Sequence, residues 1–305
     1  MRNGTLDPTV FLTLVQSPGE TACARLLIDS LRSFGGALSH CPIWVFETEG
    51  RRAHADHLAG DDVEVFPLHA PDTLKQVFFA SKVLACAQAE EMAASDVRSL
   101  IWIDPACLVI KPPVLFNLGQ EYDAAVRPVH IRNVGLPAKA PLDRFWRKIL
   151  DNAGVQDLEG SVETFVGGER IRPYFNSHAF AVRPSKGLLR LWLERFEALA
   201  SEAAFREELR QDQLHHIFLH QAVWSVLLVT HLDPARIRWL PPEYNYPYNL
   251  HDSVPEDRRA KALNDPVSIT YEERSLNPDE MDDIEIHDPL RSWLLDHAGN
   301  HSAEA

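Results

Sequence analysis

Polar side chains stand directly after the apolar strands that the sequence predicts in its first half. Asp104 follows the apolar residues 100–103, and Gln16, Ser17 and Glu47 follow two earlier apolar runs. Ligands bind beyond the carboxyl ends of the strands in a mostly parallel sheet, so these side chains are expected to share one rim. The pattern predicts a ligand site centred on Asp104 and leaves the chemistry of the ligand open.

Other chemical signatures are weaker. His215 and His216 precede His220 at helical spacing, but no Glu-x-x-His arrangement accompanies them to form a zinc-binding face. The sequence has no Gly-x-Ser-x-Gly segment, which argues against an α/β hydrolase. The 4 cysteines lack CxxC spacing, and we expect them to be reduced and structural.

The elements that position Asp104 alternate between strands and helices. Apolar strands are predicted at 11–15, 43–46, 63–66 and 100–103, with helices from about 21 to 34 and 81 to 94. Repeated strand–helix–strand units with near-continuous apolar strands indicate a mostly parallel sheet that is covered on both faces. The predicted class is therefore a single α/β domain of the Rossmann type, with a mostly parallel central sheet flanked by helices.

The second half has a less regular pattern. It predicts strands at 124–126 and 175–182, and helices near 142–152, after an N-cap at Ser185, and over 215–232. The acidic segment 252–283 is predicted to be irregular surface. We expect the domain to span residues 8–297 and residues 298–305 to form a disordered tail.

Composition and charge restrict the class of partner. Acidic residues outnumber basic ones by 44 to 30, giving a formal net charge of −14 over 305 residues. This charge disfavours nucleic acid and anionic lipid as partners. The sequence contains neither an apolar run of about 18 residues, as a membrane-spanning helix needs, nor the apolar stretch of a signal peptide. We therefore expect no membrane span and a cytoplasmic location.

Segments between about residues 10 and 295 resemble, in order and spacing, the GT-A nucleotide-sugar transferases. Residues 100–109 (LIWIDPACLV) resemble the segment that carries their Asp-x-Asp motif, and 174–182 (YFNSHAFAV) resemble their Phe-Asn-Ser-Gly strand. The further matches are His220-Gln221 at their Asp-Gln helix start, 240–246 (LPPEYNY) at their Leu-Pro-x-x-Tyr-Asn segment, and His287 with Trp293 near the C-terminus.

The resemblance implies a GT-A-like fold and a hexosyltransferase-like enzyme. Such an enzyme moves a sugar from a nucleotide-diphosphate sugar to an acceptor, which the sequence does not identify. The resemblance places Asp104 at a metal ion or the ribose, His287 at the metal or diphosphate, and Lys82 at the diphosphate. Gln16 would also contact the donor. Asn176 and Gln221 would contact the sugar, and His178 or His220 would serve as general base.

The sequence departs from this family where the metal would bind. Ala106 stands at the second aspartate position and removes one oxygen ligand for Mn²⁺ or Mg²⁺. Asp104 and His287 could still hold the ion, or Lys82 or Arg183 could carry the diphosphate charge without a metal.

Two further departures are His178, which replaces a glycine, and His220, which replaces an acidic residue. All these changes leave a second interpretation open: a catalytically inactive GT-A-like protein that binds a nucleotide or serves as a scaffold.

Overall fold

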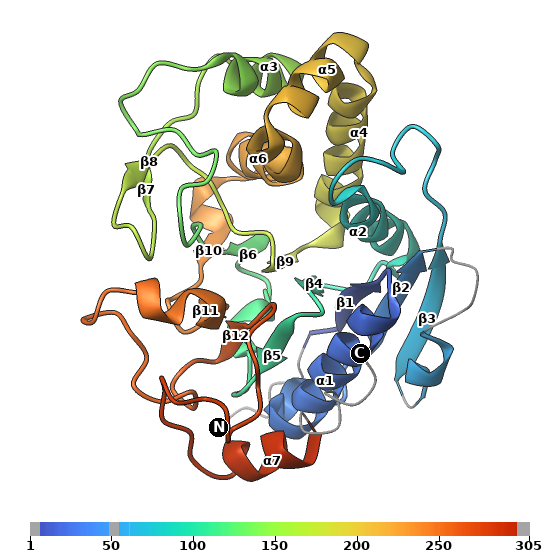
Figure 1. Cartoon of the computed structure of the whole chain (residues 1–305). Helices are drawn as coiled ribbons and strands as arrows, with labels where there is room; N and C mark the ends of the chain where they lie inside the picture. Colours follow the sequence, from blue (N-terminus) through green and yellow to red (C-terminus); the bar gives the residue numbers. More distant parts are fainter. Residues whose placement is uncertain (1–6, 49–54, 61, 298–305) are drawn as a thin grey trace.

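The computed structural model describes residues 7–48, 55–60 and 62–297, so the predicted tail at 298–305 lies outside the described residues. Its centre is a seven-stranded sheet with the order β10-β6-β9-β4-β1-β2-β3 (Figure 1). The strands are β1 (Thr9–Val15), β2 (Ile43–Thr48), β3 (Val63–Leu68), β4 (Ser99–Ile103), β6 (Ala124–Val126), β9 (Ala179–Val182) and β10 (Ile237–Trp239).

Most neighbouring strands run parallel, which confirms the predicted sheet. β1 pairs in parallel with both β2 and β4, and β10 pairs in parallel with β6. β9 is inserted between β4 and β6 and is antiparallel to both. Every residue of β1, β4, β6 and β9 is buried, as expected for strands covered on both faces.

Helices cover the sheet on both sides. Leu12 and Leu14 of β1 belong to a core that includes α2, α3, α4, α5 and α6, whereas Phe11 and Val15 pack into a second core with α1. Figure 1 shows α3 to α6 gathered at one side of the molecule and α7 beside α1 at the other. The helices are α1 (Pro18–Phe34), α2 (Ala80–Met92), α3 (Arg144–Ala153), α4 (Leu188–Ser201), α5 (Ala203–Gln211), α6 (Gln213–His231) and α7 (Leu290–His297).

The C-terminal part adds a second, smaller sheet of β5 (Cys107–Val109), β11 (Tyr246–Pro247) and β12 (Ser268–Thr270). β12 is buried and pairs antiparallel with β5, so the expectation of irregular surface throughout 252–283 was wrong. A further hairpin joins β7 (Val162–Glu163) to β8 (Arg170–Ile171). Among the described residues, no helix is long and apolar enough to cross a bilayer.

Some predicted boundaries need correction. α4 begins at Leu188 after Gly187, whose φ of +67° suits glycine, so Ser185 is not the N-cap. Ser185 lies instead in a short 3-10 turn, Pro184–Lys186. The strand predicted at 175–182 is confined to β9, and α5 was not predicted.

A buried ion cluster ties three strand ends together at the edge of the sheet. The Asp123 carboxylate accepts hydrogen bonds from Arg183 at 3.0 Å and from Arg236 at 2.7 Å, and Lys186 Nζ lies 2.9 Å away. Burial alone would raise the pKa of Asp123, but hydrogen bonds from Arg236, Lys186 and Arg183 lower it to about 2. Arg183 is thus engaged in this cluster and does not line the cavity beside Asp104.

Asp123→Asn is expected to lower the free energy of unfolding at pH 7 by roughly 3 kcal/mol, because Arg183 is left buried without its carboxylate. Since the folded-state pKa of Asp123 is depressed, its contribution is complete above the unfolded pKa of about 3.9 and is lost as the pH falls toward about 2. Urea titrations of both proteins between pH 7 and pH 2.5 measure this.

Asp72→Asn is the matched control, because the Asp72–Lys75 pair is exposed and its loss is expected to leave stability almost unchanged. Equal stabilities of Asp123→Asn and the wild type at pH 7 would contradict the role given to the cluster.

Candidate functional site

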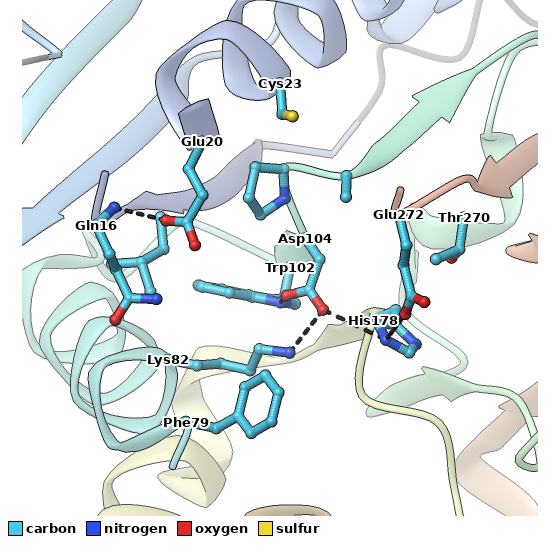
Figure 2. A pocket seen from close by; sticks show the side chains of 13 residues that line it. Gln16, Glu20, Cys23, Phe79, Lys82, Trp102, Asp104, His178, Thr270 and Glu272 are labelled. Atoms are coloured by element: carbon cyan, nitrogen blue, oxygen red, sulfur yellow. Dashed lines mark hydrogen bonds and ion pairs between the residues drawn. The ribbon is translucent and has the colours of Figure 1, made fainter. Parts of the chain in front are cut away.

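A cavity of about 200 Å³ opens where β1 and β4 end, at the rim predicted from the sequence (Figure 2). Of the sequence-predicted site residues, it brings together Gln16, Lys82, Asp104 and His178. The residues that line it are Leu14, Gln16, Glu20, Cys23, Phe79, Lys82, Trp102, Asp104, Pro105, Ala106, His178, Thr270 and Glu272.

Strand pairing places Asp104 and His178 side by side. Ile103 of β4 pairs with Ala179 of β9, and the next backbone contact is a 2.8 Å hydrogen bond from Asp104 N to the carbonyl of His178. The antiparallel insertion of β9 therefore brings residue 178 to the carboxyl end of β4, although these residues are far apart in sequence.

Both carboxylate oxygens of Asp104 are occupied by donors from the protein. Lys82 Nζ donates to Oδ2 at 2.7 Å, and Trp102 Nε1 donates to Oδ1, also at 2.7 Å. The side chain of Lys82 is only 4% exposed, so this is a buried ion pair. Charged groups out of water are retained where they are paired and hydrogen-bonded in this way.

Lys82 projects from the first turn of α2, which is preceded by Phe79 in the left-handed conformation (φ 59°). Its ammonium group lies 5.1 Å from the centre of the Phe79 ring and also donates to the carbonyl of Ser177 at 3.3 Å. An ammonium group has three donors, and these contacts with Asp104 and Ser177 use two of them. The third makes no hydrogen bond within the described part of the chain, and Lys82 lines the cavity.

His178 is held by Asn176. The Asn176 Oδ1 atom accepts from His178 N at 2.7 Å and lies 3.1 Å from His178 Nδ1, so Nδ1 carries a proton. The other ring nitrogen, Nε2, faces two carboxylates, at 3.5 Å from Glu272 Oε1 and 3.9 Å from Asp104 Oδ2. Figure 2 shows His178 between these two residues at the cavity wall.

Glu272 is a site residue that the sequence did not reveal. It follows β12, has a positive φ of 48°, and its backbone N–H donates to the carbonyl of Ala106 at 3.5 Å. A non-glycine residue in this conformation is strained, and such strain clusters at functional sites. The pKa of Glu272 is lowered, and the hydrogen bond with His178 is the largest cause. A second hydrogen bond, from Asn249 Nδ2 to Glu272 Oε2 at 2.7 Å, lowers it as well.

Glu20 was also missed, although its place in the first turn of a helix that begins just after the rim is a usable signal. Its Oε2 accepts from the backbone N of Gln16 at 2.6 Å, which fixes the end of β1. Burial raises the pKa of Glu20, and the Asp104 charge raises it further.

His220, Gln221 and Asn176 lie behind the cavity and do not line it. Ser177 Oγ lies 3.1 Å from both His220 Nε2 and Gln221 Oε1, while the His220 ring stacks on Phe79 at 4.3 Å. Burial, followed by the nearby Lys82 charge, lowers the pKa of His220 well below its usual value, so its imidazole is neutral. This geometry gives His220 a supporting contact with Ser177 and does not place it where a base would meet substrate.

His287, the expected second metal ligand, is also absent from the cavity lining. Its side chain is 60% exposed and lies 3.4 Å from Glu285, and its backbone N and O both bond to Asn264. The structure does not bring His287 and Asp104 together in this cavity.

The residues present do not fit a divalent cation. Within residues 7–48, 55–60 and 62–297, no three His, Cys, Asp or Glu side chains are arranged to hold a metal ion. Asp104, the one expected aspartate, already accepts from Lys82 and Trp102, so a cation bound to it would lie beside the Lys82 ammonium group. No chemical step is therefore assigned to a metal.

Solved structures resemble this chain although its sequence gives no match. No protein-family model matches the sequence, and no curated protein matches it. Galactosyltransferase LgtC in complex with donor and acceptor sugar analogues superimposes with a TM-score of 0.51 at 13% identity, covering 95% of each chain. An active-site mutant of LgtC gives 0.51 at 12% identity, again over 95% of each chain.

Mouse xyloside xylosyltransferase 1 gives a lower TM-score of 0.48 at 12% identity, over 86% of this chain and 97% of the other. At these identities the likeness concerns the fold. The central sheet of this chain is mostly parallel, with β9 antiparallel beside β4, and the chain matches LgtC over nearly its whole length. Both findings agree with the architecture expected from the sequence. The chain has the GT-A fold of glycosyltransferases.

Proposed function

We propose that this protein is a glycosyltransferase that moves a sugar from a nucleotide-diphosphate sugar to an acceptor hydroxyl. One observation carries the proposal: in a GT-A fold, the cavity at the end of β4 combines a cationic donor, Lys82, with a candidate base, His178, on either side of Asp104 (Figure 2). The fold match to LgtC, solved with donor and acceptor sugar analogues, supports the same class of reaction.

Lys82 is the group proposed to receive the diphosphate. When the bond between the sugar and the diphosphate breaks, its electron pair leaves with the diphosphate, whose oxygens gain negative charge. A pre-oriented ammonium group on a largely buried side chain stabilises that charge without reorganising. Asp104 and the Ser177 carbonyl hold Lys82 in place. Gln16, also on the cavity wall, is proposed to contact the donor.

His178 is the proposed general base. Because Asn176 Oδ1 accepts from Nδ1, Nε2 is the ring nitrogen proposed to accept the proton of an acceptor hydroxyl as its oxygen bonds to the sugar, the hydroxyl replacing Glu272 as the partner of Nε2. Glu272 then lies 3.5 Å from the imidazolium that forms and stabilises its charge. Asn176 is thereby proposed to position the base, and Gln221 to position Ser177, in place of direct contact with the sugar.

A second candidate is a nucleotide-binding protein without turnover. The observation that favours it is the occupation of both Asp104 oxygens by Lys82 and Trp102, which leaves that carboxylate little capacity for a ligand. The two candidates differ in whether the bound donor is ever cleaved.

Nucleotide binding is tested by thermal unfolding with UDP, GDP and their sugars. A ligand at 100 times its Kd stabilises the folded state by about 2.7 kcal/mol, so one member of the panel is expected to raise Tm by several degrees. Lys82→Met is expected to abolish that shift, measured from the variant's own Tm, because the diphosphate loses its cation.

Lys75→Met removes an exposed lysine and is expected to keep the full shift. To separate binding from misfolding, Lys82→Met/Asp104→Asn removes both charges of the pair and is also expected to show no shift. Failure of every nucleotide to stabilise the wild type would refute the proposed donor site.

Catalysis is tested with His178→Gln once a donor is found. Loss of the base is expected to reduce kcat for transfer or donor hydrolysis by about 10²–10⁴-fold, while the nucleotide-induced Tm shift persists. Product release monitored by chromatography measures the rate. Full activity in His178→Gln would remove it as the base, and nucleotide binding with no turnover in the wild type would favour the second candidate.

A further inference from the structure

Two positions where the sequence departs from the family pattern, Ala106 and His178, lie at the same cavity. Ala106 lacks a carboxylate, but its carbonyl accepts from the backbone N of Glu272, so the structure brings a glutamate from the turn after β12 to the cavity. Asp104 and Glu272 thus both line the cavity. Each carboxylate, however, faces a basic side chain of the protein.

The basic side chains are Lys82 and His178. Lys82 Nζ lies 2.7 Å from Asp104 Oδ2, and His178 Nε2 lies between the carboxylates, 3.9 Å from Asp104 and 3.5 Å from Glu272. His178 occupies the position where the family has a glycine, whose lack of a side chain would leave this space open. The imidazole and the ammonium group together occupy the surroundings of both carboxylates.

A divalent cation meets two obstacles here. It requires oxygen lone pairs, and each oxygen of Asp104 already accepts one hydrogen bond, from Lys82 or from Trp102. It also meets the positive charge of Lys82, whose side chain is almost fully buried and therefore poorly screened. Moving the ammonium group aside would cost its contacts with Asp104, Ser177 and the Phe79 ring.

We infer that Lys82, with His178 beside it, takes the place of the divalent cation in this cavity, so that the site works without a metal ion. The inference concerns the site of the proposed function and rests on it only for the identity of the ligand. The ammonium group then serves as a resident cation that is built into the chain and held by Asp104.

The test is a titration of the protein with Mn²⁺ alone, in which the electron paramagnetic resonance signal of the free ion measures how much is bound. Wild-type protein is expected to bind Mn²⁺ only weakly, with a Kd above about 1 mM. Lys82→Gln/Ala106→Asp removes the resident charge and restores a second aspartate. It is expected to bind one Mn²⁺ at least about tenfold more tightly, because a nearby positive charge no longer repels the ion.

Adding Asp104→Asn to that double variant is expected to abolish the new binding, which locates the ion. Lys75→Gln/Ala106→Asp is the matched control, since it makes the same type of changes but keeps Lys82. Circular dichroism establishes that each variant is folded. If Lys82→Gln/Ala106→Asp is unfolded, Lys82→Gln alone is expected to bind Mn²⁺ more tightly than the wild type.

Tight binding of one Mn²⁺ by the wild type that is lost in Asp104→Asn would overturn the inference. A folded Lys82→Gln/Ala106→Asp variant that gains no Mn²⁺ binding would overturn it as well. Neither outcome depends on a nucleotide sugar, so a failure of the proposed transferase activity and a failure of this inference are separable.

Discussion

The burial of the central sheet on both faces is the constraint from which the rest of the structure follows. Strands such as β1 and β4 have no solvent-facing side, so a polar or charged residue inside them would lose its hydration without compensation. The charged side chains of the cavity therefore lie outside these strands, beyond strand ends or in the first turn of a helix. Asp104 follows β4 and His178 precedes β9, whereas Asp123 precedes β6 at the opposite, structural end. One constraint thus produces both the cavity and the ion cluster.

Two of the buried carboxylates, Asp104 and Asp123, illustrate different uses of the same physics. Asp123 is surrounded by three cations, and its role is to tie strand ends. Asp104 has one ammonium group and one indole N–H, and an open cavity beside them. A buried pair of this kind contributes little net stability, because desolvation offsets much of the attraction. Its value here is geometric: it fixes one ammonium group at the wall of a cavity.

The sequence predicted the mostly parallel sheet and the rim at Asp104, because apolar periodicity and strand ends are local signals. The GT-A architecture was implied by the resemblance of its segments to that family. The sequence also named Lys82 and His178. It did not predict Glu272, because that residue reaches the cavity through β5–β12 pairing within a segment that has no periodicity. The family resemblance placed His220, Gln221 and His287 at the site. In the structure His220 and Gln221 are buried behind Ser177, and His287 is exposed beside Glu285. These placements depend on tertiary packing, which the residue type at one position does not reveal.

The backbone contact between Ala106 and Glu272 also has a consequence for the order of assembly. Lys82 and Asp104 are 22 residues apart, so their pair requires only one helix and one strand, whereas Lys82 meets Ser177 across 95 residues. Glu272 arrives later still along the chain, and closing the longest loop costs the most entropy. The Lys82–Asp104 pair can therefore form before Glu272 reaches the cavity, and losing the contacts of the C-terminal segment would remove Glu272 while that pair stays in place.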